Sequence, residues 1–159
     1  MYFFLKNKSN SGFTLIEIII TLGIISLIST ALYASFASSN RRQVLEKQTA
    51  SILALLEDAH SETLSSKNLY QYGVHLDADQ AVLFRGSAYS ALDASNQVQP
   101  LDNRVTISDI SLAGGGSDVL FDRLTGATSN SGSLTVTLAA DNSQTKTITI
   151  FKTGLIESN

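Results

Sequence analysis

The amino-acid sequence predicts an α+β protein in which one long N-terminal helix packs against a C-terminal antiparallel β-sheet. Three observations lead to this prediction. Residues 13–39 are mostly apolar and carry a single charge, the apolar residues that follow recur at helical spacing, and the pattern beyond residue 69 alternates with a period of two. A helix followed by a series of half-buried strands is typical of the α+β class.

The N-terminal apolar stretch is long enough to cross a membrane. A spanning helix needs roughly 20 apolar residues, and residues 13–39 exceed this length with Glu17 as their only charge. A cleavable signal peptide would end near residues 35–37 and leave a chain that begins near Ser38, whereas a plain membrane anchor would keep Met1. Neither interpretation gives Glu17 a role, although an acid within a spanning helix costs about 2.5–3.5 kcal/mol on insertion scales.

The helix is expected to continue past the membrane, over residues 13–66. Beyond residue 40 the apolar positions lie close to a 3.6-residue period, at Leu45, Ile52, Leu55, Leu56, Ala59 and Leu64. No proline interrupts the segment, since the only proline of the chain is Pro100. At about 1.5 Å per residue, such a helix would be about 80 Å long.

The rest of the chain is expected to form antiparallel strands. Tyr70, Tyr72, Val74 and Leu76 alternate with polar or small residues, residues 77–80 form a turn and residues 81–84 return. A polar loop over residues 96–103 and a break at the three glycines 114–116 are expected. Further strands are expected at residues 104–110, 119–121, 133–138 and 145–151, with a turn at 140–143.

The hexapeptide GFTLIE at residues 12–17 joins a short segment containing Lys6 and Lys8 to the apolar stretch. In sequence and position it resembles the processing motif of type IV pilins and type II secretion pseudopilins. The resemblance implies that a prepilin peptidase cleaves between Gly12 and Phe13 on the cytoplasmic side and that Phe13 is then N-methylated. It further implies a type IV pilin-like fold with a leader at residues 1–12, a membrane-spanning and filament-core segment at residues 13–39, and a soluble head at residues 40–159.

Glu17 gains a role in this interpretation. A carboxylate in the first helical turn is favoured by the helix dipole and by the unpaired N–H groups there. The resemblance implies a stronger partner, the new Phe13 amine of a neighbouring subunit. Because opposite charges in an apolar bundle attract strongly only when they meet in register, our hypothesis is that Glu17 sets the axial register of a helical filament.

A second, looser resemblance concerns the C-terminal part. Residues 119–157 are similar to the C-terminal pattern of the pseudopilin H family. The residues that carry the similarity are Phe121 through Gly126, the strands at 134–138 and 147–151, and Gly154 through Ile156. The family includes minor pilins called fimbrial protein T. Many major pilins carry a helix-bending proline and a cysteine pair. The first half of the helix lacks a proline and the chain has no cysteine, so the departures favour a minor subunit.

Other candidate sites have simpler explanations. The acidic residues at 77 and 79 lack the further ligands of a calcium loop, and residues 114–116 lack the lysine of a phosphate-binding loop. His60, Ser61 and Glu62 are consecutive on a helix and point in different directions, so they cannot form a catalytic triad. The net charge of −3 and pI near 5.2 argue against a general nucleic-acid-binding surface.

The sequence therefore predicts a minor pilin or pseudopilin, with no enzymatic activity, cofactor or metal. Expected partners are other pilin or pseudopilin subunits, the prepilin peptidase and methyltransferase, the inner-membrane assembly platform and, before assembly, the lipid bilayer. The expected location is the inner membrane, with the leader in the cytoplasm and the head outside, followed by an extracytoplasmic filament. The alternative is a secreted or membrane-anchored binding protein with an ordinary signal peptide or anchor.

Overall fold

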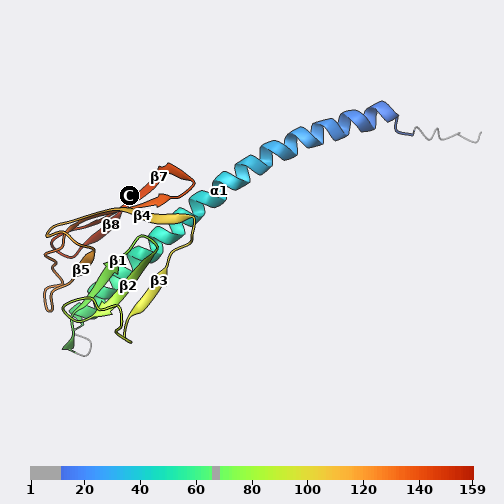
Figure 1. Ribbon diagram of the computed structural model, residues 1–159. Helices are drawn as coiled ribbons and strands as arrows, with labels where there is room; N and C mark the ends of the chain where they lie inside the picture. Colours follow the sequence, from blue (N-terminus) through green and yellow to red (C-terminus); the bar gives the residue numbers. More distant parts are fainter. Residues whose placement is uncertain (1–11, 66–68) are drawn as a thin grey trace, which may run out of the picture. The chain divides into compact units, whose positions relative to one another are not determined.

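The computed structural model describes residues 12–65 and 69–159 and confirms the predicted α+β, pilin-like fold. A single long helix, α1 (Leu15–Leu64), is followed in these residues by eight strands (Figure 1). The chain divides into two units, Met1–Ser39 and Asn40–Asn159, and we call the second unit the head. The strands are β1 (Tyr72–Leu76), β2 (Gln80–Arg85), β3 (Gln97–Pro100), β4 (Val105–Leu112), β5 (Asp118–Leu120), β6 (Gly132–Leu138), β7 (Asp141–Ile150) and β8 (Ile156–Ser158).

Helix α1 supplies the spine of the head. Its 50 residues correspond to about 75 Å at the standard rise. The expected apolar stripe is buried at Leu45, Ile52, Leu56 and Ala59 and half-buried at Leu55. The prediction was wrong for Leu64, which is 43% exposed, because the neighbouring Thr63 takes the last core position. The Thr63 hydroxyl accepts a hydrogen bond from the Tyr72 amide at 3.0 Å, which ties the end of α1 to the start of β1.

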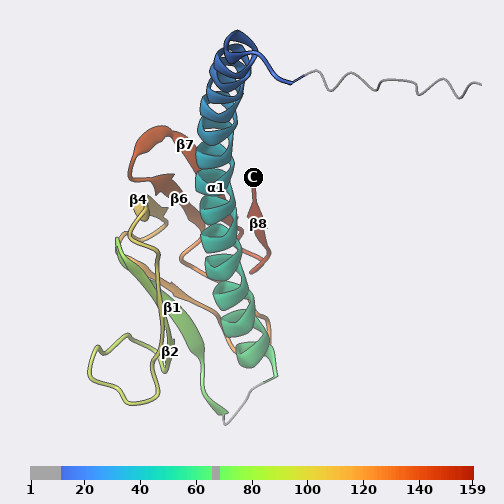
Figure 2. The ribbon, with the colours of Figure 1, turned by 90° about the vertical axis from the view of Figure 1, so that its right-hand side faces the viewer.

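The strands form two antiparallel sheets of four strands each, where the sequence suggested one. Their orders are β3-β2-β1-β5 and β4-β6-β7-β8, and both lie against the second half of α1 (Figures 1 and 2). The Ala78 carbonyl links the sheets, since it accepts hydrogen bonds from the Ile107 amide at 3.0 Å and the Thr106 hydroxyl at 2.9 Å.

Two strands were missed by the sequence analysis. The expected loop at residues 96–103 contains β3, which pairs with β2 at the edge of the first sheet. Pro100 is compatible with this place because an edge strand needs no amide donor on its outer side. Strand β8 pairs with β7 at the edge of the second sheet. The β6–β7 hairpin turns between Leu138 and Asp141, and its register shifts between Thr137 and Leu138.

One hydrophobic core is shared by α1 and the inner faces of both sheets. It contains the helix residues named above and the alternate, inward-facing residues of the strands. The largest fully buried members are Phe121, Ile52, Leu56, Leu76, Leu134, Leu138, Ile148 and Ile150. Tyr70 was expected to belong to this set, but it is 46% exposed and its ring lies under the Arg85 guanidinium, 4.5 Å from it.

A smaller cluster covers the outer face of the first sheet. Val82 and Phe84 are only 1% exposed although they lie outside the central core. The Tyr89 ring stacks on His75 with centroids 4.0 Å apart and meets Phe84 edge-on at 5.7 Å. His75 was expected to lie opposite the apolar residues of β1, and it does so, with Nδ1 2.6 Å from an Asp118 carboxylate oxygen. The segment between β2 and β3 is therefore anchored to the sheet by aromatic contacts.

Candidate processing and assembly site

The start of α1 is shaped by a capping box at residues 14–17. The amide of Glu17 donates a hydrogen bond to the Thr14 hydroxyl at 3.3 Å, and the Ile18 amide donates to the Thr14 carbonyl at the same distance. Thr14 is thus the N-cap, and Glu17 stands three residues later, where the sequence signature T-x-x-E places an acid. The sequence analysis missed the role of Thr14, although this spacing reveals it.

Only half of the usual capping box is formed, and it uses the Glu17 amide rather than its side chain. In a complete box the carboxylate bonds back to the N-cap amide, but within the described residues no hydrogen bond or ion pair of the Glu17 carboxylate is formed. Glu17 is exposed and lies in the first helical turn, where the dipole favours a negative charge. The carboxylate is therefore held at the helix start with its oxygens open to a cation from outside the chain.

Gly12 and Phe13 precede the helix and are exposed. The Phe13 side chain is 79% exposed. A Cβ added at Gly12 would meet no atom within 4 Å, so the fold itself does not require glycine at this position. Lys6, Lys8 and the rest of the expected leader up to residue 11 lie outside the described residues.

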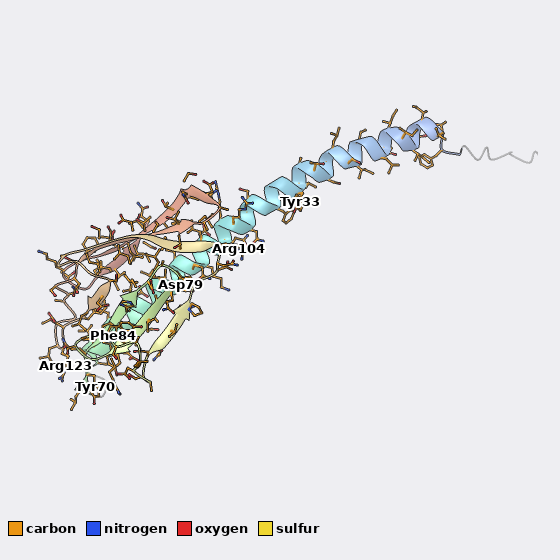
Figure 3. All side chains as sticks on the ribbon, in the orientation of Figure 1. Tyr33, Tyr70, Asp79, Phe84, Arg104 and Arg123 are labelled. Atoms are coloured by element: carbon orange, nitrogen blue, oxygen red, sulfur yellow. The ribbon has the colours of Figure 1, made fainter. Side chains whose placement is uncertain are left out.

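The first half of α1 presents apolar side chains in every direction. They stand out from the helix along its length, with Tyr33, 78% exposed, among the last of them (Figure 3). Three of its hydroxyl groups are satisfied within the helix, because Thr21, Ser26 and Thr30 donate to the preceding turn at 2.8–2.9 Å. The helix is long and apolar enough to cross a membrane. Such a surface is compatible with lipid or with other apolar helices around it.

Comparison with family models gives one match, at residues 7–33, to the prokaryotic N-terminal methylation motif. The chain carries a type IV pilin-like prepilin signal. The matched residues include the capping box and the first part of the apolar helix, and this combination indicates a pilin- or pseudopilin-like protein that is processed as a prepilin. The motif also suggests assembly with other pilins, and the apolar helix is compatible with membrane anchoring. No curated protein and no solved structure matches the chain.

The other candidate residues have structural roles. The His60 ring packs edge-on against Phe121, with centroids 5.2 Å apart, and lies against the backbones of Gly126 and Gly154. Asp77 closes the β1–β2 turn, since its carboxylate accepts a hydrogen bond from the Ala78 amide at 2.8 Å. The described residues contain no group of three or more potential metal ligands from histidine, cysteine, aspartate and glutamate.

Proposed function

We propose that this chain is a minor pilin or pseudopilin, a non-enzymatic structural subunit of a type IV pilus or a type II secretion pseudopilus. The observation that carries the proposal is the open Glu17 carboxylate at the capped start of an apolar helix that begins two residues after Phe13. The matched methylation motif supports the same conclusion. Of the two machines, neither is favoured by a residue of the head.

Processing follows from the motif. Hydrolysis of the Gly12–Phe13 peptide bond would leave the carboxylate on the leader and a new amine on Phe13, to which a methyl group is then transferred. The exposure of both residues, outside the helix, suits entry into a peptidase site. The absence of any atom within 4 Å of a Cβ at Gly12 supports a requirement for glycine that comes from the peptidase rather than from the fold.

Assembly follows from the chemistry of α1. The cationic Phe13 amine of one subunit and the Glu17 carboxylate of the next can pair in the filament core, where apolar helices surround them. Removing one partner of a buried ion pair costs about 3–5 kcal/mol, because the other charge is left buried and unpaired. The same helix surface that contacts lipid before assembly can contact neighbouring helices afterwards, since side-chain packing and polar contacts replace lipid contacts.

The assignment to a minor subunit similar to pseudopilin H rests on the C-terminal pattern. In the head, the His60 side chain lies against three residues of this pattern, Phe121, Gly126 and Gly154. Residues that are far apart in the pattern therefore act together in the fold. The proposed similarity to pseudopilin H is carried by the sequence pattern, and the absence of cysteine and of a proline in α1 agrees with a minor role.

The proposal is tested by removing the negative charge of Glu17 and measuring how much of the subunit is incorporated into filaments. We expect Glu17→Gln to reduce the subunit in sheared filaments at least about a hundredfold, following the cost of an unpaired buried charge, while its amount in membranes is kept. Glu57→Gln is the matched control, because Glu57 is an exposed acid on the same helix but within the head. Wild-type incorporation of Glu17→Gln would contradict the proposed role.

A further inference from the structure

A polar pocket lies where the head begins, between α1 and the start of β7. Its volume is about 290 Å³, and it is lined by Arg42, Leu45, Glu46, Ser143, Gln144, Thr145 and Lys146. We call it the base pocket. All of its residues belong to the head, so its shape depends only on the packing of β7 against the helix within this unit.

Two cations of the base pocket have no partner among the described residues. The side chains of Arg42 and Lys146 form no hydrogen bond or ion pair with other described residues. The third charge of the lining is Glu46, one helical turn from Arg42, and it too forms no ion pair. The pocket therefore has an excess of positive charge, although acidic residues outnumber basic ones in the head as a whole.

Two charged residues outside the lining, Asp141 and Arg104, are already engaged. Asp141 accepts hydrogen bonds from the Ser143 hydroxyl at 2.6 Å and from the Gln144 amide at 2.9 Å. These bonds, with a smaller effect of Arg41, lower the pKa of Asp141 and keep it ionised. Arg104 is held by Asp102 through two bonds of 2.8 Å. The donors left for a ligand are thus the two cations and the Thr145 hydroxyl.

The position of the pocket along the chain indicates where its ligand comes from. Arg42 comes three residues after Ser39, the last residue of the apolar stretch. Along a helix, Ser39 and Arg42 are therefore separated by about 5 Å. If the apolar stretch spans a bilayer, as our proposed function requires, Arg42 lies at the level of the lipid headgroups. Arginine, lysine and hydroxyl donors suit a phosphate group.

We propose that the base pocket binds the phosphate of an anionic phospholipid, such as phosphatidylglycerol, while the subunit is in the membrane. Arg42 and Lys146 contact the phosphate from opposite walls, and Thr145 donates a hydrogen bond. The lipid holds the β6–β7 hairpin against the membrane surface until the subunit is extracted into a filament.

The test is native mass spectrometry of the full chain in detergent, titrated with phosphatidylglycerol or phosphatidylcholine. Each cation near an anionic surface contributes about fivefold in affinity. We expect the wild type to prefer phosphatidylglycerol by at least about tenfold, and Arg42→Gln with Lys146→Gln to lose this preference. Arg123→Gln with Lys152→Gln is the control of equal charge, because both residues are exposed and lie outside the base pocket, and it should keep the preference.

Four outcomes would overturn the inference. The first is equal binding of both lipids, and the second is a preference that survives the Arg42 and Lys146 exchange. The third is binding of free glycerol 3-phosphate as tight as that of the lipid, which would indicate a site for a soluble phosphate. If the double variant changed only the self-association of the chain, the pocket would instead contact an acidic subunit, and the lipid assignment would be wrong. The intact mass in the same spectra reports removal of the leader, so failure of lipid binding can be distinguished from failure of the proposed function.

Discussion

Gly126 is a position where a single added methyl group should disturb the head through one identifiable side chain, His60. Its φ is +68°, in the left-handed region, and a Cβ there would overlap the His60 ring and lie 3.1 Å from a Leu64 methyl group. The left-handed backbone costs alanine about 1–2 kcal/mol, of which about 0.4–1 kcal/mol is offset by the reduced freedom of the unfolded chain. Displacing His60 also removes its edge-on contact with Phe121, which costs about 0.5–1.5 kcal/mol of stability. Overpacking by the added methyl group costs about 1–3 kcal/mol more.

We therefore expect Gly126→Ala to lower the free energy of unfolding by about 2–6 kcal/mol. The matched control is Gly115→Ala, because φ of Gly115 is +75° but no atom lies within 4 Å of its added Cβ. The control should lose about 1 kcal/mol or less, from backbone strain alone. Urea unfolding of the full chain in a mild detergent, followed by circular dichroism, measures both values.

A double-mutant cycle separates the contact with His60 from the backbone effect. When His60 is already alanine, the loss caused by Gly126→Ala should fall to that of the Gly115 control, since the overlapping ring is absent. The reasoning is refuted if Gly126→Ala costs no more than Gly115→Ala, or if the His60 exchange leaves its cost unchanged.

Three further predictions concern other parts of the chain. Thr63→Val removes the acceptor of the buried Tyr72 amide, and the same unfolding assay should show a loss of about 1–3 kcal/mol. Arg104 holds the pKa of the Asp102 carboxyl well below its ordinary value of 3.8, so the ion pair stabilises the fold above about pH 4 and less at lower pH. The wild type should thus have a higher free energy of unfolding than Asp102→Asn at pH 7, and this difference should become smaller in acid or in high salt. A difference in free energy that is equal at pH 7 and pH 2.5 would refute the prediction. Gly12→Val should leave unfolding unchanged, since nothing contacts the residue, but should abolish the processed form seen by mass spectrometry.

The sequence predicted the elements whose burial repeats locally. The helical stripe from Leu45 to Ala59 and the alternation in β1, β6 and β7 are set by which residues face one core, and this periodicity is visible without knowledge of the partners. The methylation motif was recognised for a similar reason, because its residues are contiguous.

The missed features depend on contacts between distant residues or on weak local signals. Strand β3 is short and polar and contains Pro100, so it resembles a loop until β2 pairs with it. The burial of Phe84 depends on Tyr89, which arrives from an irregular segment with no periodic pattern. The base pocket joins Arg42 to Lys146 across about a hundred residues, and spacing in the sequence indicates nothing of such a pair. The role of Thr14 was the exception, since the capping-box spacing was readable.

The most direct measurement for the central claim is the N-terminal residue and intact mass of the protein purified from its own membranes, with and without the prepilin peptidase. The account predicts a chain that begins at N-methylated Phe13 and a full-length chain when the peptidase is absent. A chain that begins near Ser38 would indicate an ordinary signal peptide, and one that keeps Met1 in the presence of the peptidase would indicate a plain anchor. Either result would contradict the account and leave Glu17 without its proposed partner.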